Sequence, residues 1–390
     1  MKNIKDAAVG NKTVLVRVDY NVPLKDEVVQ DMSRIEASLP TIHDLQERDA
    51  KIILISHLGR PKGAPKKELS LKPIQGVLQS LVQKGTVYFC PSLKPQDIRT
   101  SLDLLNAGDI LLLENIRFDA REEANDASFS KMLASFGDIF VNDAFSASHR
   151  AHASVEGLTH YMPAYGGHQL LCEIESLEKY LSHPETPFWT IVGGAKISTK
   201  LPLLEKLLDV ADGIFVGGAM ANTLLKSQGY NVGKSLAEDD LIPECKRLIK
   251  AAEEKNCTLL WPSDVVVAES PESDTFRTIP ISDLETNEMI LDVGENTLNI
   301  LKSHLKSAKT IVWNGPLGLV EIAPYDKGTQ SMGCILSQLG AIKVAGGGDT
   351  VSILKKLNLI EAFNYVSLAG GAFLEWLEGR ELPGIKALQK

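Results

Sequence analysis

Two lysines, Lys196 and Lys200, stand four residues apart in the stretch TIVGGAKISTK, directly after a short apolar run and a glycine pair. The run FWTIV is typical of a buried strand that turns at Gly193 and Gly194, and the following KISTKLPLLEKLLDV has the apolar spacing of a helix. We therefore expect both lysines in or near the first turns of that helix. Because a helix N-terminus is partly positive and like charges at this spacing repel, the placement costs about 0.5 to 1.5 kcal/mol. A solvated helix face is the alternative interpretation, but the repulsion favours a site for an anion.

A second glycine-rich turn, AGGGDT, ends in Asp349 and Thr350. A plain strand-to-helix turn in which Asp349 caps the helix is the alternative interpretation. A glycine-lined helix start also suits phosphate oxygens and Mg²⁺, since Mg²⁺ usually takes only one or two carboxylates plus substrate phosphates. The turn therefore predicts a site for a nucleotide with its metal.

Basic and polar residues follow the strands expected in the first half of the chain. They are Arg17, Asp19, Asn21, His57, Arg60, Arg117, His149, Arg150 and His152. Asp19 and Asn21 also suit ordinary turns, although their polar neighbours at the other strand ends favour ligand contact. Arginines bind a small anion bidentately, whereas glycines let backbone N–H groups approach phosphates closely. Because twenty of the thirty glycines follow Thr190, we assign the nucleotide to the second half and a small anion to the first.

Three further patterns fail as binding motifs. GYNVGKS, Gly229 to Ser235, has too few residues between its glycines for a P-loop and reads as a surface turn. After Gly346 and Gly348 the third position of a dinucleotide-binding fingerprint is Val351, so that fingerprint is absent. HRAH offers two histidines without a third convergent ligand, which disfavours a metal site.

Length and charge bound the class of protein. The 390 residues suit two domains of ordinary size, and a net charge of -9 with a pI near 5.5 disfavours binding to nucleic acid or to an anionic membrane. Five scattered cysteines form no zinc or disulfide pattern, and no apolar run approaches the length of a membrane helix. The N-terminal MKNIKDAAVGNK lacks the apolar core of a signal peptide, so we expect a soluble cytoplasmic protein.

Short β-rich runs alternate with helical patterns along the whole chain, which predicts an α/β fold with parallel sheets covered on both faces. Ligands of such folds bind beyond the carboxyl ends of the strands. The helical stretch HQLLCEIESLEKYLSHPETP lies near the middle of the chain, and Pro184 and Pro187 end it before the next strand. We expect it to connect the two domains.

Nine segments, taken in order, resemble the phosphoglycerate kinase family: VRVDYNVP, SHLGRP, LLENIRF, NDAFSASHRAHAS, VGGAKISTK, VGGAMANT, IVWNGPLGLVE, AGGGDTV and LAGGAFLEWLEG. The resemblance covers nearly the whole chain. It implies two Rossmann-like three-layer α/β/α domains with parallel sheets, joined by a hinge helix. The first domain, 1–170, would bind phosphoglycerate, and the C-terminal segment 372–390 would return to it. The connector would be 171–185 and the nucleotide-binding domain 186–371.

The resemblance also assigns roles to individual residues of this sequence. Those that would bind phosphoglycerate are Asp19, Asn21, Arg34, His57, Leu58, Gly59, Arg60, Arg117 and Arg150. Those that would bind the nucleotide are Lys200, Asn314, Glu321, Gly347, Gly348, Asp349 and Thr350, with Asp349 contacting Mg²⁺ largely through the nucleotide. Arg34, Lys196 and Lys200 would be catalytic. The chain departs from the family at Ser146 to Ser148, where Gly-Thr-Ala is usual, and at Ala369, where glycine is usual.

The implied reaction is reversible transfer of a phosphoryl group between 1,3-bisphosphoglycerate and ADP, giving 3-phosphoglycerate and ATP, in glycolysis and gluconeogenesis. Two alternatives stay open: a kinase of another small phosphorylated acid, and a noncatalytic nucleotide sensor on the same fold. A sensor would lack an essential charge, yet Arg34, Lys200 and Asp349 are all present. We expect a hinge-bending monomer with small-molecule substrates, and no nucleic-acid or membrane partner.

Overall fold

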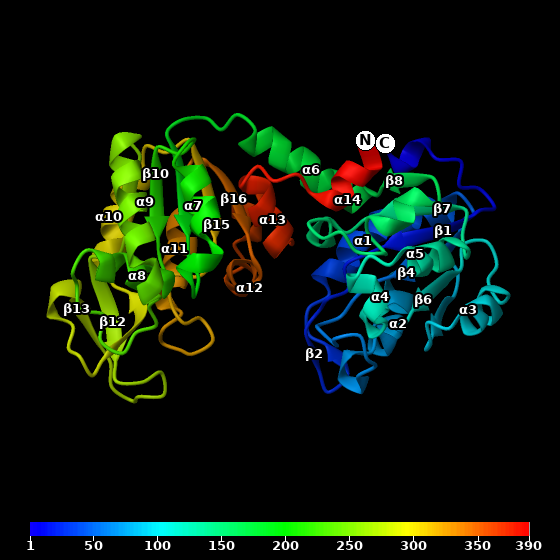
Figure 1. Cartoon of the computed structure of the whole chain (residues 1–390), viewed down its shortest axis with the longest axis horizontal. Coiled ribbons are helices and arrows are strands. Elements are labelled where there is room, and N and C mark those ends of the chain that lie inside the picture. Colours follow the sequence, from blue (N-terminus) through cyan, green and yellow to red (C-terminus); the bar gives the residue numbers. More distant parts are fainter. Residues whose placement is uncertain (390) are drawn as a thin grey trace. The chain divides into compact units, whose positions relative to one another are not determined.

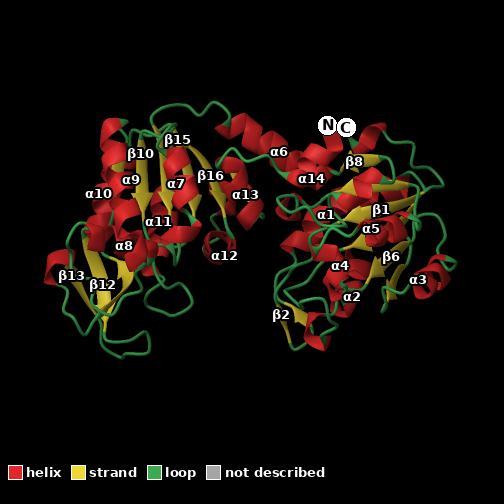
Figure 2. Cartoon of the chain, viewed as in Figure 1, coloured by secondary structure: helices red, strands yellow, loops and turns green. Residues whose placement is uncertain are grey.

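The computed structural model describes residues 1–389 and divides into two compact units. The first comprises Met1–Glu175 and the segment from Glu381 on, and the second comprises Ser176–Arg380. The first division falls inside helix α6 (His168–Leu181), which ends before Pro184. Both units contain a six-stranded sheet with helices against it (Figures 1 and 2).

The sheet of the first unit has the strand order β5-β6-β4-β1-β7-β8, and every pair in it is parallel. Its strands are β1 (Thr13–Arg17), β4 (Lys51–Ile55), β5 (Val87–Cys90), β6 (Ile110–Leu113), β7 (Ile139–Asn142) and β8 (Ala164–Gly166). A separate two-residue hairpin, β2 (Leu24–Lys25) with β3 (Val28–Val29), precedes the first long helix. The predicted parallel α/β fold is confirmed for this unit.

Helices bury both faces of this sheet, which explains why its strands are almost continuously apolar. Val14 and Val16 of β1 share one core cluster with Ile35 and Ile42 of the helix that follows. Leu15, which points to the opposite face, is buried as well. The helices of the unit are α1 (Ser33–Glu47), α2 (Lys72–Leu81), α3 (Pro95–Leu102), α4 (Ala120–Glu123), α5 (Ala127–Ala134) and the C-terminal α14 (Pro383–Lys386).

The sheet of the second unit is also parallel, in the order β11-β10-β9-β15-β16-β17. Its strands are β9 (Phe188–Val192), β10 (Gly213–Val216), β11 (Thr258–Leu260), β15 (Thr310–Asn314), β16 (Ile342–Gly346) and β17 (Tyr365–Ser367). Its helices are α7 (Leu201–Leu207), α8 (Met220–Ser227), α9 (Ile242–Glu254), α10 (Glu295–Leu305), α11 (Lys327–Ser337), α12 (Gly348–Lys356) and α13 (Gly370–Leu377). Trp313 lies fully buried in a cluster with Leu301 and Met332 of α10 and α11.

A small antiparallel sheet in the second unit departs from the expected all-parallel pattern. It has the order β13-β12-β14, with β12 (Asp264–Ala268), β13 (Arg277–Pro280) and β14 (Met289–Val293). The alternation of β-rich runs and helical patterns predicted a parallel sheet for the run MILDV, which is β14, as for the other runs. The antiparallel pairing has a local cause, because β12 and β13 lie close together in the chain. In β13 only Ile279 is buried, which is typical of an antiparallel strand with one face in solvent.

Candidate functional site

The residues predicted to bind a small anion lie just beyond the carboxyl ends of strands in the first unit. Asp19 follows β1, His57 follows β4, Arg117 follows β6 and Arg150 follows β7. Strands β1, β4, β6 and β7 are neighbours in one parallel sheet, so their carboxyl ends meet at one edge. Arg34, near the start of α1, reaches the same edge through an ion pair with Asp19. We call this the arginine edge.

Asp19 is the centre of the first set of contacts at the arginine edge. Its Oδ2 accepts from Nη1 of Arg34 at 2.5 Å and also from the hydroxyl of Ser146. Its Oδ1 accepts from the backbone N–H of Asn21 at 3.0 Å. Ser146 is one of the departures from the family pattern, and it was not among the residues predicted to bind the anion. Its place in the loop after β7 is the signal that would have found it.

Asn21, Gly59 and Arg117 form a second set of contacts that ties the loops after β1, β4 and β6 together. The side-chain oxygen of Asn21 accepts from the Gly59 N–H at 2.9 Å, and the Gly59 carbonyl accepts from Nη1 of Arg117 at 2.9 Å. Gly59 has φ of +61, and a Cβ there would approach the Leu69 side chain to 2.7 Å. Glycine is therefore required at this junction, both for its backbone conformation and for space. Leu58 beside it is buried and supplies its backbone carbonyl to Asn115 rather than a polar side chain.

Positive charges crowd the arginine edge and shift the titration of its members. Burial, followed by the charge of Arg150, lowers the pKa of Arg117 to about 10. Burial and Arg150 also lower the pKa of His149 to about 4, and burial followed by the charge of Arg117 lowers that of His152 to about 3. Such a concentration of cations stabilises a bound anion and disfavours a metal ion.

Arg150, the HRAH stretch and Arg60 have fewer contacts than the residues described so far. Nε of Arg150 donates to Nε2 of His149 at 3.0 Å, so this histidine nitrogen is already engaged and the HRAH stretch does not converge on a metal. Arg60 is exposed and makes no hydrogen bond or ion pair with residues 1–389. The structure therefore brings Asp19, Asn21 and Arg34 into direct contact with neighbours, and leaves Arg60 open to solvent.

In the second unit, the α-helix begins later than the apolar spacing predicted. Lys196 is exposed and precedes a short 3-10 turn, Ile197–Thr199, and Lys200 directly precedes α7, which begins at Leu201. Pro202 lies in the first turn of α7, where its missing N–H costs no hydrogen bond, so the α-helix starts only there. The two lysines are therefore not neighbours on one face of an α-helix, and the repulsion argument from helical spacing does not apply to them.

Lys200 is nevertheless held at the carboxyl edge of the second sheet. Its Nζ donates to Oδ1 of Asn314, the last residue of β15, and Nδ2 of Asn314 donates to the carbonyl of Gly346 at 2.9 Å. Burial lowers the pKa of Lys200 to about 8, against the opposing effect of the nearby carboxylates of Asp349 and Glu378. Two of the predicted nucleotide-binding residues, Lys200 and Asn314, thus contact each other directly.

Glycine-rich turns make up the rest of this edge, which we call the glycine edge. Gly347 has φ of 99, a left-handed conformation that favours glycine, and it precedes α12. A Cβ on Gly193 would lie 2.0 Å from the carbonyl oxygen of Pro316, so only glycine lets the turns after β9 and β15 approach. The hydroxyl of Thr350 accepts from the Gly315 N–H at 2.8 Å and is buried, which fixes one turn against the other.

Two acidic side chains lie at the same edge. Asp349 and Glu321 are both exposed, and burial of part of the Asp349 carboxyl together with the charge of Glu321 raises the pKa of Asp349. Gly348 is open on its Cβ side, with no atom within 4 Å. A pair of carboxylates next to open glycine turns suits a cation that brings its own phosphate ligands.

Ala369, the second departure from the family pattern, is compatible with the backbone at its position. It precedes α13 with φ of -102 and ψ of 104, an extended conformation that any residue adopts. Its N–H donates to the hydroxyl of Ser367 at 3.1 Å, and the residue is buried. The extra methyl therefore causes no backbone strain.

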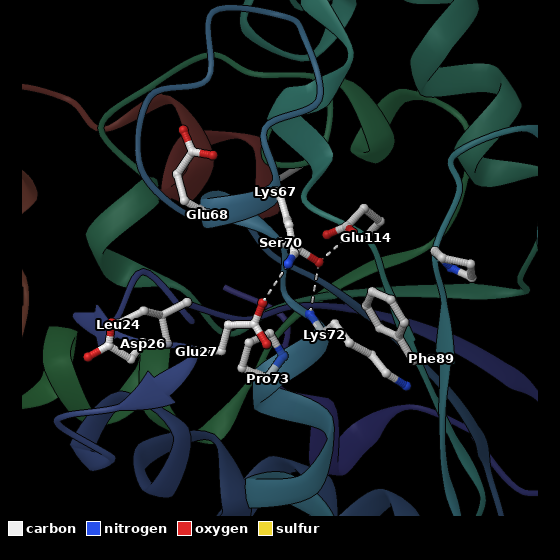
Figure 3. A pocket seen from close by; sticks show the side chains of 11 residues that line it. Leu24, Asp26, Glu27, Lys67, Glu68, Ser70, Lys72, Pro73, Phe89 and Glu114 are labelled. Carbon is white, nitrogen blue, oxygen red and sulfur yellow. Dashed lines mark hydrogen bonds and ion pairs between the residues drawn. The ribbon is translucent and has the colours of Figure 1, made fainter.

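A hollow of about 940 Å³ lies beside hairpin β2–β3 in the first unit (Figure 3). Its charged lining residues are Asp26, Glu27, Lys67, Glu68, Lys72 and Glu114. Acids outnumber lysines there, and Nζ of Lys67 already lies 3.3 Å from Oε1 of Glu27. None of the residues predicted to bind the small anion lines this hollow, so we assign no substrate to it.

Three other features of the described chain bear on the sequence predictions. Within residues 1–389, no three histidine, cysteine or acidic side chains gather in a way that could hold a metal ion without another ligand. Within the same residues, no helix combines the length and apolarity needed to cross a membrane. The P-loop-like stretch from Gly229 to Ser235 lies in turns after α8 and enters no helix.

The two parallel sheets make this an α/β protein with two chemically different carboxyl edges, one with arginines and one with glycine turns. A family model described as phosphoglycerate kinase matches residues 4–380. The chain belongs to the phosphoglycerate kinase family.

Individual relatives agree with the family model. The phosphoglycerate kinase of Chelativorans sp. (strain BNC1) is 47% identical over 395 residues, which cover 100% of this chain and 98% of the relative. The structure of phosphoglycerate kinase from Coxiella burnetii matches with a TM-score of 0.84 at 40% identity, covering 99% of this chain and 98% of that chain. The crystal structure of phosphoglycerate kinase from Pyrococcus horikoshii OT3 matches with a TM-score of 0.87 at 28% identity, covering 100% and 98%.

Proposed function

We propose that this chain transfers a phosphoryl group reversibly between 1,3-bisphosphoglycerate and ADP, giving 3-phosphoglycerate and ATP. The observation that carries the proposal is the chemical division between the two carboxyl edges in a member of the phosphoglycerate kinase family. One edge offers arginine side chains to a small anion, and the other offers glycine turns and a lysine to a nucleotide. Each edge matches one of the two substrates.

In this proposal the arginine edge binds 3-phosphoglycerate. Arg34, Arg60, Arg117 and Arg150 would face the phosphate and carboxylate groups, because guanidinium groups bind such anions bidentately. His57 would add a hydrogen bond. Asp19 and Asn21 would hold the loops and Arg34 in place through the contacts already described.

The glycine edge would bind the nucleotide. Lys200 and Lys196 would contact its phosphates, and the turns at Gly347 and Gly348 would let backbone N–H groups approach them. Glu321 would bind the ribose, and Asn314 would hold Lys200 in position. Bound phosphates would favour the charged form of Lys200, whose pKa of about 8 already leaves it mostly protonated at neutral pH.

Asp349 is the residue we propose for Mg²⁺, together with oxygens of the nucleotide phosphates. The available donor groups suit Mg²⁺, which prefers few protein ligands. Asp349 offers one exposed carboxylate, Glu321 lies nearby, and the glycine turns leave space for the phosphates. When bound, the metal would neutralise part of the phosphate charge. The protein residues would orient the phosphates around it.

The reaction itself needs no general base. In the direction that consumes ATP, the nucleophile is the carboxylate of 3-phosphoglycerate, which is already ionised at neutral pH. Catalysis then depends on alignment and on stabilisation of the negative charge that spreads over the transferring group. A well-placed arginine supplies about 10³- to 10⁵-fold in rate in related phosphoryl transfers. Arg34 and Lys200 are our candidates for this role, and Lys196 is a third.

Two substrates held on different units must be brought together before transfer. Reacting atoms must approach to about 3 to 3.5 Å, and water must be excluded so that ATP is not hydrolysed. We therefore propose a hinge around α6 and the chain near Gly371, with closure favoured when both substrates contribute binding energy. A monomer in the cytoplasm is sufficient for this mechanism.

The direct test is a coupled assay with purified protein, 3-phosphoglycerate and Mg-ATP. We expect turnover that depends on Mg²⁺ and on both substrates. A screen of other small phosphorylated acids in the same assay separates this function from that of a kinase with a different acceptor. Folded protein without turnover in either direction would contradict the proposal.

A further inference from the structure

The ring of His57 is hydrogen-bonded through one nitrogen to a buried arginine. Nη2 of Arg17, the last residue of β1, lies 3.0 Å from Nδ1 of His57. A guanidinium group has only donors, so Nδ1 must accept this bond and carries no proton. Burial, together with the charges of Arg17, Arg117 and Arg150, holds the pKa of His57 well below its usual range. The ring is therefore neutral, and its single proton is on Nε2.

Arg17 has almost no freedom to move away from this position. It is 1% exposed, its Nε donates to the hydroxyl of Ser154 at 2.9 Å, and its Nη1 donates to the carbonyl of Val18. The Ser154 hydroxyl donates in turn to Oε1 of Glu122 at 2.6 Å, while the Ser154 N–H donates to Oε2 at 2.9 Å. Both carboxylate oxygens of the fully buried Glu122 thus accept; burial raises the pKa of this carboxyl, and the charge of Arg17 and the bonds from Ser154 oppose that shift.

We propose that Arg17 is a positioning residue that holds His57 in the Nε2–H tautomer, so that a neutral imidazole donates one hydrogen bond to an anionic oxygen of the substrate. This inference rests on the proposed binding of 3-phosphoglycerate at the arginine edge. Within residues 1–389, no protein group is hydrogen-bonded to Nε2 of His57. From the sequence, Arg17 is only one of several basic residues near strand ends, and no motif assigns it a role.

The tautomer decides whether His57 attracts or repels the substrate. With the proton on Nδ1, Nε2 would present a lone pair to a phosphate or carboxylate oxygen, and the two would repel. With the proton on Nε2, the ring donates without adding another positive charge beside Arg117 and Arg150. The donor is also ready at neutral pH, because no proton has to be taken up before binding.

The first test reads the tautomer itself, without a ligand. The full chain is labelled with 15N-histidine, and the ring nitrogens are correlated with ring protons by NMR. The chain has eight histidines, so His57→Gln identifies the signals of residue 57 by their loss. We expect a protonated Nε2 and a bare Nδ1 in the wild type, and a mixture of tautomers in Arg17→Met. A wild-type His57 protonated on Nδ1 would overturn the proposal.

Because Arg17→Met can also disturb folding, Ser154→Ala serves as a milder change: it removes the acceptor of Arg17 Nε and one hydrogen bond to Glu122, but it leaves the guanidinium group in place. In this variant we expect the His57 signals to shift toward those of a mixture of the two tautomers, while the signals of the other histidines stay unchanged. Circular dichroism and thermal unfolding check that the variants are folded. Unchanged His57 signals in a folded Arg17→Met protein would also contradict the inference.

The second test measures binding of 3-phosphoglycerate by titration calorimetry. A glutamine amide can donate from near the place of Nε2, whereas the shorter asparagine cannot, so His57→Gln is the conservative variant and His57→Asn is its matched control. We expect His57→Gln to retain most of the affinity and His57→Asn to lose about 10- to 100-fold. Equal losses in both variants would exclude a donor role for Nε2.

A pH series separates a neutral donor from a charged one. For a neutral ring, the ratio of wild-type to His57→Gln affinity stays constant from about pH 6 to 8, whereas an imidazolium would make it rise toward low pH. A ratio that rises at low pH would overturn the inference. If the wild-type protein fails to bind 3-phosphoglycerate at all, the proposed function is wrong, and the NMR experiment still decides the tautomer independently.

Discussion

The arginine edge and the glycine edge bind anions by different physical means. At the arginine edge the groups that would face the ligand are long side chains, and much of the structure serves to hold them, as Asp19 holds Arg34 and the Gly59 carbonyl holds Arg117. At the glycine edge the absence of side chains matters most, since a Cβ on Gly193 would lie 2.0 Å from the Pro316 carbonyl oxygen. Binding depends on charge at one edge and on backbone fit at the other.

This difference predicts which property of the protein changes when a residue of each edge is replaced. Removal of a guanidinium or ammonium group should change affinity or rate and leave the fold intact, because these groups lie at the ends of side chains. Addition of a methyl group at a glycine should displace the backbone, and ligand binding should change only as a consequence of that displacement. Five predictions follow this distinction, from the largest expected effect to the smallest.

Removal of either proposed transition-state charge should give the largest effect. Arg34→Ala and Lys200→Ala should each lower kcat by about 10²-fold or more while the protein stays folded, because their contacts strengthen as charge develops on the transferring group. The coupled assay measures kcat, and thermal unfolding checks the fold. Arg121→Ala, which removes an exposed arginine of the first unit that is paired with Asp119, is the matched control. Near-normal kcat in both test variants would refute the assignment.

A methyl group at the glycine edge should act through packing. Gly193→Ala should destabilise the protein by about 1 to 3 kcal/mol, because its Cβ would overlap the carbonyl of Pro316. Denaturant unfolding measures this change. Gly340→Ala is the control, since a Cβ there meets no atom within 4 Å. We expect the affinity for 3-phosphoglycerate to be unaffected in folded Gly193→Ala. If the affinities for 3-phosphoglycerate and for the nucleotide fell equally, the two edges would not bind their ligands independently.

Removal of the proposed metal ligand should affect one substrate only. Asp349→Ala should weaken binding of Mg-ATP by about tenfold, the scale of one lost charge-assisted contact, and leave 3-phosphoglycerate affinity largely unchanged. Calorimetric titration with each ligand compares the two. Glu253→Ala, which removes an exposed carboxylate from α9 in the same unit, is the control. If both affinities fell equally, separate sites for the two substrates would be excluded.

The titration of Lys200 should limit activity in alkali. Because its pKa is lowered to about 8, the free protein loses this positive charge as pH rises through 8, so kcat/KM should fall about tenfold for each further pH unit. Lys200→Arg stays charged throughout this range. A pH profile of kcat/KM should therefore lose its alkaline limb in this variant, and an identical limb would mean that another group titrates.

Domain closure should give the smallest measurable change. Small-angle X-ray scattering should show the radius of gyration falling most when both substrates are bound, because each ligand alone supplies only part of the energy for closure. The free protein and the two singly liganded forms are the controls. A radius that stays constant across all four states would exclude the hinge.

The helix after β9 shows where sequence reasoning was incomplete. Apolar spacing predicted one continuous helix from Lys196 on, but the chain forms a 3-10 turn and α7 begins at Leu201. Pro202 was the available signal, since proline favours the first turn of a helix over its interior. The antiparallel pairing of β14 could not be predicted either, because a short apolar run such as MILDV has the same pattern in a parallel and in an antiparallel sheet.

The sequence by itself determined the parallel α/β fold, the family, and the chemical contrast between an arginine-rich first half and a glycine-rich second half. The fold and the contrast follow from local pattern and composition, which each stretch of chain carries on its own, whereas the family follows from the resemblance of the nine quoted segments. Only the tertiary structure decided which atoms meet: that Ser146 binds Asp19, that Lys200 binds Asn314, and that Arg17 bonds to Nδ1 of His57. Such contacts join residues far apart in the chain, so they depend on strand order and on the path of the loops. The tautomer of His57 depends in turn on its contact with Arg17.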